Sequence, residues 1–256
     1  MYRDFIEDRI NVFLEEFEKL IIKENIPITD FLYKECDYKT DNTLPKIDDS
    51  FTLFTPYLNR WGGKKEKHAW FYNEIEVPSH WNGEIQLAVA SDARQGWACI
   101  NPQFIAYVDG KLQQGIDKNH REVFLTNGTH KVYLYAYSGS VHNEYLDFTA
   151  NLQLVDSKTK QLYYDIKVPF EILAFEDENS RNYFEIKKHL NNALNFIDMR
   201  SPYSDEYYVS LDKAIDYLKT EFYGKYCKKG DVFAFCIGHT HIDVAWEWTL
   251  AQTREK

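Results

Sequence analysis

The side chains with the clearest capacity for chemistry lie in residues 238–248, which read GHTHIDVAWEW. His239, His241 and Asp243 are spaced by two, so in an extended segment all three project to one side. Imidazole nitrogens and a carboxylate oxygen together suit a borderline cation such as Zn²⁺. The preceding apolar run, DVFAFCI at 231–237, predicts a strand buried on both faces of a parallel sheet, and sites in such sheets lie beyond the carboxyl ends of the strands. The spacing therefore indicates part of a metal site.

Other interpretations of the same run stay open. A single His near a strand end is more often a hydrogen-bonded structural residue than a metal ligand. Among metal hydrolases, the metallo-β-lactamase-like pattern HxHxDH requires a His where this sequence has Val244. An amidohydrolase-type HxH does not predict the WEW sequence at 246–248. A metal hydrolase acting on amides or phosphoesters would be distinguished by a measured substrate preference.

Residues 238–256, GHTHIDVAWEWTLAQTREK, resemble the segment that opens the catalytic domain of glycoside hydrolase family 38 α-mannosidases of the bacterial type. That segment has the pattern H-[ST]-H-x-D-x-x-W. The resemblance implies that His241 and Asp243 bind zinc, that His239 supports these ligands, and that Trp246 stacks under a bound mannose ring. The sequence NPQFIAYVDGKLQQGIDKNHREV at 101–123 is similar to the N-terminal sandwich of the same enzymes.

The resemblance also implies a reaction. Members of the family are retaining exo-glycosidases that use a carboxylate nucleophile and a second carboxyl group as acid and base. Zinc holds the 2- and 3-hydroxyls of the terminal mannose. The family's nucleophile and remaining metal ligands lie well downstream of the motif, whereas this sequence ends at Lys256. We therefore assign no catalytic residue in this chain and expect it to be the inactive N-terminal part of a larger enzyme for terminal α-mannosides. Mannosylglycerate-type hydrolases share the motif, so that substrate stays open.

The elements that must position this motif change type along the chain. Apolar residues at three- and four-residue spacing predict a helix over 2–22 and a helical hairpin in which Ser204 is an N-cap. Period-two alternation, with Asp109-Gly110 and Asn127-Gly128 as hairpin signals, predicts antiparallel strands between the helices. The longest alternating run is Leu146 to Leu154, followed by a second at 162–168.

The expected fold is mainly β with flanking helices. We predict four segments along the chain: an N-terminal helix and linker (1–60), an antiparallel, galactose-binding-like β-sandwich (61–175), a helical hairpin (180–228) and the first strand of a truncated α/β catalytic domain (229–256).

A second hypothesis makes the chain a carbohydrate-binding or scaffold module without catalysis. Aromatic faces suit sugar rings, and four tryptophans lie in or near the sandwich: Trp61, Trp70, Trp81 and Trp97. Tryptophans in a sandwich are more often part of its core.

The composition of the chain limits the classes of binding partner and the cellular location that we expect for it. The net charge of −10 and the lack of a basic block argue against nucleic acid and anionic membranes. No apolar stretch approaches the roughly 20 residues that span a bilayer. The acidic, amphipathic N-terminus is not a signal peptide, and four widely spaced cysteines fit reduced thiols, so we expect a cytoplasmic protein. An exposed strand edge in residues 231–256 would allow a homo-oligomer.

Overall fold

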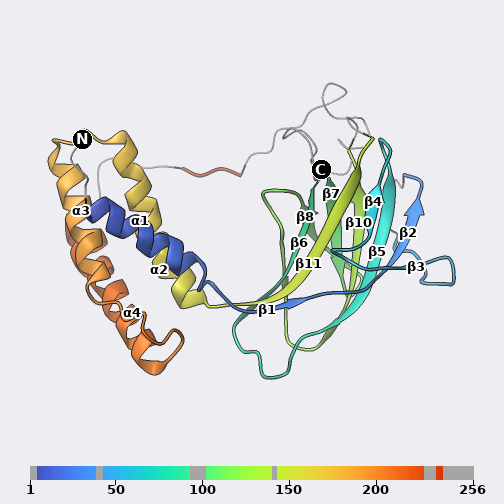
Figure 1. Ribbon diagram of the computed structural model, residues 1–256, viewed down its shortest axis with the longest axis horizontal. Helices are drawn as coiled ribbons and strands as arrows, with labels where there is room; N and C mark the ends of the chain where they lie inside the picture. Colours follow the sequence, from blue (N-terminus) through green and yellow to red (C-terminus); the bar gives the residue numbers. More distant parts are fainter. Residues whose placement is uncertain (1–4, 39–42, 93–101, 140–142, 228–234, 239–256) are drawn as a thin grey trace. The chain divides into compact units, whose positions relative to one another are not determined.

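The computed structural model describes residues 5–38, 43–92, 102–139, 143–227 and 235–238. The chain forms two compact units (Figure 1). A β-sandwich comprises Glu24–Leu154, and a helical unit is built from the chain before and after it. The structure is therefore mainly antiparallel β with flanking helices, as the sequence predicts.

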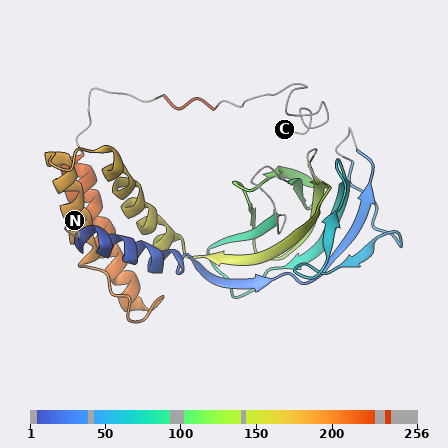
Figure 2. The same cartoon turned by 45° about the horizontal axis from the view of Figure 1, so that its top comes forward.

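The sandwich consists of two sheets, whose strands can be followed in Figure 2. The five-stranded sheet has the order β1-β11-β6-β9, with β4 paired to β11, and the six-stranded sheet has the order β3-β2-β5-β10-β7-β8. All pairings within the six-stranded sheet are antiparallel. The strand bounds are β1 Ile22–Pro27, β2 Phe31–Cys36, β3 Thr52–Phe54, β4 Arg60–Gly62, β5 His68–Glu76, β6 Glu84–Asp92, β7 Gln103–Val108, β8 Lys111–Ile116, β9 Glu122–Leu125, β10 Thr129–Tyr137 and β11 Tyr145–Val155.

Alternation along the strands assigns side chains to two faces. In β11 the apolar members of the alternating run, from Leu146 to Leu154, are buried in the core between the sheets. In β10, Val132, Leu134 and Ala136 face this core, so the intervening tyrosines must face the other way. The six-stranded sheet thus has an inner, apolar face and an outer face rich in tyrosine.

The two predicted turn dipeptides have different roles. Asp109 and Gly110 have φ values of 51° and 80° and close the β7–β8 hairpin, as predicted. Asn127-Gly128 instead connects β9 and β10, which belong to different sheets, so the predicted hairpin at this dipeptide is wrong. The Asn127 amide donates to the Trp81 carbonyl at 2.9 Å, which ties this turn to a neighbouring loop.

The helical unit has its own apolar core. Its helices are α1 Phe5–Glu18, α2 Ser157–Ile172, the 3₁₀ turn η1 Leu173–Phe175, α3 Arg181–Leu194, α4 Asp205–Tyr217 and the π-helical segment η2 Leu218–Tyr226. Ser204 is the N-cap of α4, as predicted, and its hydroxyl accepts a hydrogen bond from the Tyr207 amide at 3.2 Å. Leu190 and Leu211, from the two predicted helical stripes, are fully buried in the shared core.

The second alternating run, 162–168, is not a strand. It lies in α2, where Leu162, Ile166 and Pro169 are buried at three- and four-residue spacing. Tyr164 and Val168, which period two would place with them, are 49% and 52% exposed. The Asp156 carboxylate accepts a hydrogen bond from the Thr159 amide at 2.8 Å and so caps the helix. The alternation was a coincidence within an amphipathic helix.

The first sixty residues hold more than the predicted helix and linker. Strands β1, β2 and β3 all fall within 1–60, and β4 begins at its end. β1 and β4 pair with β11, and β2 pairs with β5, so these partners come much later in the sequence and local patterns contain little sign of the pairing. The sandwich consequently begins before residue 61.

The predicted strand at 231–237 is described only in its last three residues. Residues 235–238 have no regular structure, and Phe235 and Ile237 are 88% and 84% exposed. A strand of a parallel sheet needs hydrogen-bonded neighbours, and no described strand pairs with these residues. The buried strand is therefore absent from this described part. Within the described residues, no helix combines the length and apolarity required to cross a membrane.

Candidate functional site

The predicted metal site lies outside the described residues. His239, His241, Asp243 and Trp246 all belong to 239–256, so the structure does not report on their arrangement. Elsewhere, in the residues that the structure describes, no group of three or more His, Cys, Asp or Glu side chains is placed to hold a metal ion. The donor set of two imidazoles and one carboxylate fits Zn²⁺ chemically. Zinc ligation by His241 and Asp243 stays a prediction.

The described tryptophans of the sandwich do not form a surface platform for a sugar ring. Trp61 and Trp81 are each 1% exposed and belong to the core between the sheets. Their indole N–H groups donate to Ser91 and Glu24, each at 3.0 Å. Trp70 is also buried, and Trp97 lies outside the described residues. The described tryptophans thus match the core interpretation, and a binding site must be sought elsewhere.

The outer face of the six-stranded sheet carries two rows of side chains across hydrogen-bonded strands. The register aligns Gly115, Ile105, Tyr135, Trp70 and Lys34 on β8, β7, β10, β5 and β2. The adjacent row contains Gln103, Tyr137, His68 and Cys36. These residues come from five strands and share a face only because of the sheet order.

A cavity of about 280 Å³ opens where these rows meet β8, and we call it the outer-face pocket. Its floor and walls are formed by Gln103 and Ile105 of β7, Gly115 of β8, and Tyr135 and Tyr137 of β10. Both tyrosines are largely buried, whereas Gln103 and Ile105 are partly accessible. The pocket therefore has an apolar floor with an amide at one side.

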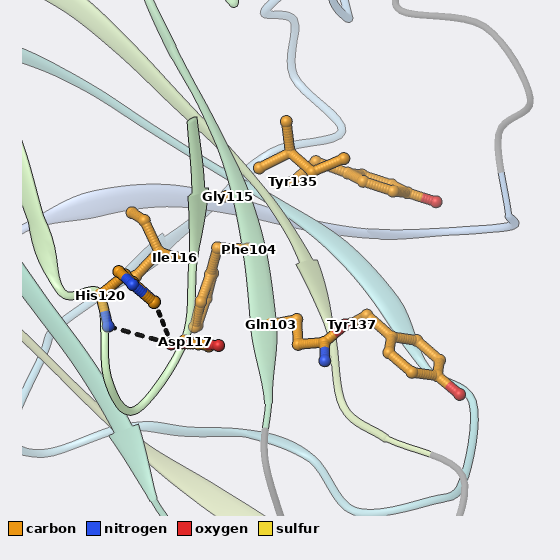
Figure 3. Close-up of a pocket in the computed structure, with 9 residues that line it drawn as sticks. Gln103, Phe104, Gly115, Ile116, Asp117, His120, Tyr135 and Tyr137 are labelled. Carbon is orange, nitrogen blue, oxygen red and sulfur yellow. Dashed lines mark hydrogen bonds and ion pairs between the residues drawn. The ribbon is translucent and has the colours of Figure 1, made fainter. Parts of the chain in front are cut away.

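Asp117 and His120, from the loop after β8, form the opposite side of the outer-face pocket (Figure 3). One carboxylate oxygen of Asp117 accepts hydrogen bonds from the amides of Asn119 and His120 at 2.8 and 2.9 Å. The His120 ring nitrogen Nδ1 lies 3.2 Å from the same oxygen. Burial alone raises the pKa of Asp117, but these hydrogen bonds outweigh it and the net pKa lies below the ordinary value. Asp117 is ionised at neutral pH, and its second oxygen has no hydrogen-bond partner among the described residues.

Gly115 keeps the centre of the pocket open. It lies inside β8, where glycine weakens a strand and commonly marks a place that something else approaches closely. A Cβ atom at this position would meet only the Phe104 carbonyl oxygen, at 3.9 Å, and the backbone is not in the left-handed region. Neither backbone conformation nor packing requires a glycine here. Its effect is to leave space beside Ile105.

A second hollow of about 360 Å³ lies on the other side of Tyr137. His68 lines it and is stacked on Tyr135 and Tyr137, with ring centroids 5.4 and 4.9 Å apart. Burial lowers the pKa of His68 to about 4, so the ring is neutral at pH 7. Its Nδ1 atom has no hydrogen-bond partner within the described part of the chain. Unlike the outer-face pocket, this hollow is bordered by lysines, including Lys64 and Lys65.

Sequence reasoning missed the outer-face pocket. Gln103, Ile105, Gly115, Asp117 and His120 all lie in the 101–123 stretch that resembles the mannosidase sandwich. The Asp109-Gly110 turn predicts that this stretch folds back on itself, but nothing local predicts that Tyr135 and Tyr137 complete a pocket there. The other available signal was a glycine inside an alternating strand pattern.

Comparison with known proteins finds a distant sequence similarity to a glycosidase. No protein-family model matches it. Alpha-mannosidase G of Dictyostelium discoideum is 19% identical over 265 residues, covering 95% of this chain and 22% of that protein. The chain therefore spans about a fifth of the length of the curated relative that it matches. Among solved structures, it is similar to the native structure of a family 35 carbohydrate binding module from Clostridium thermocellum, with a TM-score of 0.29 and 13% identity over 50% of this chain and 97% of that one.

Proposed function

We propose that this chain supplies the N-terminal part of a retaining, metal-dependent α-mannosidase that hydrolyses terminal α-mannosides. The observation that carries the proposal is the similarity to alpha-mannosidase G across 95% of the chain. A match of that extent involves the helical unit and the sandwich as well as any short motif. The HTHID sequence independently resembles the opening of the family 38 catalytic domain.

His241 and Asp243 are the proposed metal ligands in this chain. Zinc bound there would orient the sugar through its hydroxyls and stabilise charge that develops in the transition state. His239 would hold the ligands in position, and Trp246 would pack against the ring of the terminal sugar. The nucleophile and the acid–base carboxyl group are not assigned to any residue of this chain. Cytoplasmic location and self-association stay predictions.

The test is hydrolysis of a chromogenic α-D-mannoside by the full-length protein from the same gene, with and without a chelator. We expect His241→Ala and Asp243→Asn each to lower kcat/KM at least about 100-fold and to reduce the bound zinc, because each removes a metal ligand. His80→Ala is the matched control, since its exposed imidazole lies in the sandwich rather than in the motif. The 256-residue chain alone should show no turnover.

Full activity in both ligand variants, or activity that a chelator leaves unchanged, would refute the metal role. Chelator-sensitive cleavage of mannosylglycerate in preference to aryl mannosides would redirect the proposal to that hydrolase type. Cleavage of amides or phosphoesters instead of mannosides would overturn the glycosidase assignment.

A further inference from the structure

We propose that the outer-face pocket binds a single neutral pyranose unit of a carbohydrate. This site lies in the sandwich, so it is distinct from the metal motif and does not depend on the mannosidase proposal. The argument uses the size of the pocket, the placement of its polar groups, its charge and its glycine.

The size of the pocket limits the ligand. Pockets for drug-sized molecules measure about 300–1,000 Å³. At about 280 Å³ the outer-face pocket lies just below this range. It therefore suits one sugar ring better than a buried oligosaccharide, and its opening to solvent leaves room for the glycosidic oxygen to continue outward.

The pocket lining separates apolar from polar groups in the way that a sugar ring requires. A pyranose has an apolar C–H surface and a rim of hydroxyls. The Ile105 side chain lines the pocket and supplies apolar surface beside Gly115, which has no side chain. The Gln103 amide and the Asp117 carboxylate lie on opposite sides (Figure 3). The free oxygen of Asp117 can accept from a sugar hydroxyl, and such charge-assisted hydrogen bonds are the stronger kind. The amide of Gln103 can both donate and accept, and its side chain has no hydrogen bond to another described residue.

The charge of the pocket selects against anionic sugars. Asp117 is ionised, and the other titratable side chains that line the pocket are His120, Tyr135 and Tyr137. A carboxylate or phosphate on the ligand would face Asp117 without a lysine or arginine in the lining to offset the repulsion. We therefore expect neutral sugars in the outer-face pocket.

The experiment measures binding of methyl α-D-mannopyranoside, methyl α-D-glucopyranoside and methyl α-D-galactopyranoside to the 256-residue chain by saturation-transfer NMR and titration calorimetry. We expect at least one of them to bind with a Kd near ~1 mM, as befits one small site. Gly115→Val should weaken binding at least tenfold, because it fills the pocket without straining the backbone. Asp117→Asn should also weaken it, since the amide keeps an oxygen for the loop but removes the charge.

Gln113→Val is the matched control, because it places the same side chain at an exposed position of β8 outside the pocket lining. Thermal unfolding and near-ultraviolet circular dichroism verify that each variant is folded. The proposal is overturned by no saturation transfer to any pyranoside at 50 mM, by equal affinity in Gly115→Val and wild type, or by glycerol binding as tightly as the best sugar. Loss of mannosidase activity in His241→Ala does not bear on any of these outcomes.

Discussion

His68 is an imidazole held inside an aromatic row rather than at the protein surface. It is 5% exposed and stacked between Tyr135 and Tyr137, and burial holds its pKa near 4. An unfolded chain restores the ordinary value of about 6.5. Between about pH 4 and pH 6.5, the His68 ring is protonated in the unfolded chain and neutral in the folded protein. Stability from the neutral ring is therefore complete above about pH 6.5 and is lost as the pH falls toward 4.

This titration can be measured at a single residue. Lowering the pH from 7 to 4.5 should cost the wild-type chain about 1–3 kcal/mol through His68. His68→Phe retains an aromatic ring in the row but cannot be protonated, so its loss of stability over this interval should be smaller by that amount. Urea unfolding at the two pH values gives the difference, and other histidines cancel between the two proteins. An identical pH dependence in both would show that His68 titrates normally.

At the scale of residues, the two sites were predictable to different degrees. The HTHID motif could be recognised because its ligands are neighbours in sequence, although the structure does not describe them. Gln103, Gly115 and Asp117 become neighbours only when β7 and β8 pair and the loop after β8 folds back. The Asp109-Gly110 turn predicts the β7–β8 hairpin, but no local pattern predicts that Tyr135 and Tyr137 of β10 pair beside β7 and complete the pocket.

Helix α2 shows what an N-cap contributes at the scale of an element. Asp156 caps it, and the same carboxylate accepts a hydrogen bond from the Tyr208 hydroxyl of α4. Asp156→Ala should lower the free energy of unfolding by about 1–2 kcal/mol, because it removes the cap and leaves that hydroxyl without its acceptor. Chemical denaturation followed by far-ultraviolet circular dichroism measures the loss.

Asp156→Asn serves as the control, since asparagine caps helices about as well as aspartate. It should retain most of the stability. An alanine variant as stable as wild type would mean that α2 is held by its buried face alone.

Elements with a long, consistent period were predicted well. The helices α1, α3 and α4 and the long strand β11 follow the apolar spacing that the sequence displays. The strand predicted at 162–168 was wrong because the apolar positions there fit both a period-two strand and a helix. The N-cap Asp156 favours the helix. Strands β1 to β4 were missed for another reason: all four are short, and β1, β2 and β4 each have a partner strand more than thirty residues away.

At the scale of the whole molecule, three apolar clusters hold the described fold together: one between the sheets, one in the helical unit and one that includes Trp70 and Tyr135 on the outer face of the six-stranded sheet. No metal-binding group of three or more side chains occurs in the ranges that the structure describes. A chelator should therefore shift the thermal unfolding midpoint of the 256-residue chain by less than about 1 °C, whereas the proposed function expects the chelator to abolish mannoside hydrolysis by the longer protein. Differential scanning calorimetry with and without chelator measures the shift. A decrease of several degrees would reveal a structural metal.

The order of elements along the chain makes the sandwich an insertion. It is entered through β1 and left through β11, which are hydrogen-bonded neighbours. Where these strands meet the helical unit, the Asp156 amide donates to the Ile21 carbonyl at 2.8 Å. This hydrogen bond joins the two segments of the helical unit at the point where the chain leaves for the sandwich and comes back from it. In modular terms the sandwich is an exchangeable domain: a protein engineer should be able to replace Glu24–Leu154, which contains the outer-face pocket, between two chain ends that already lie together.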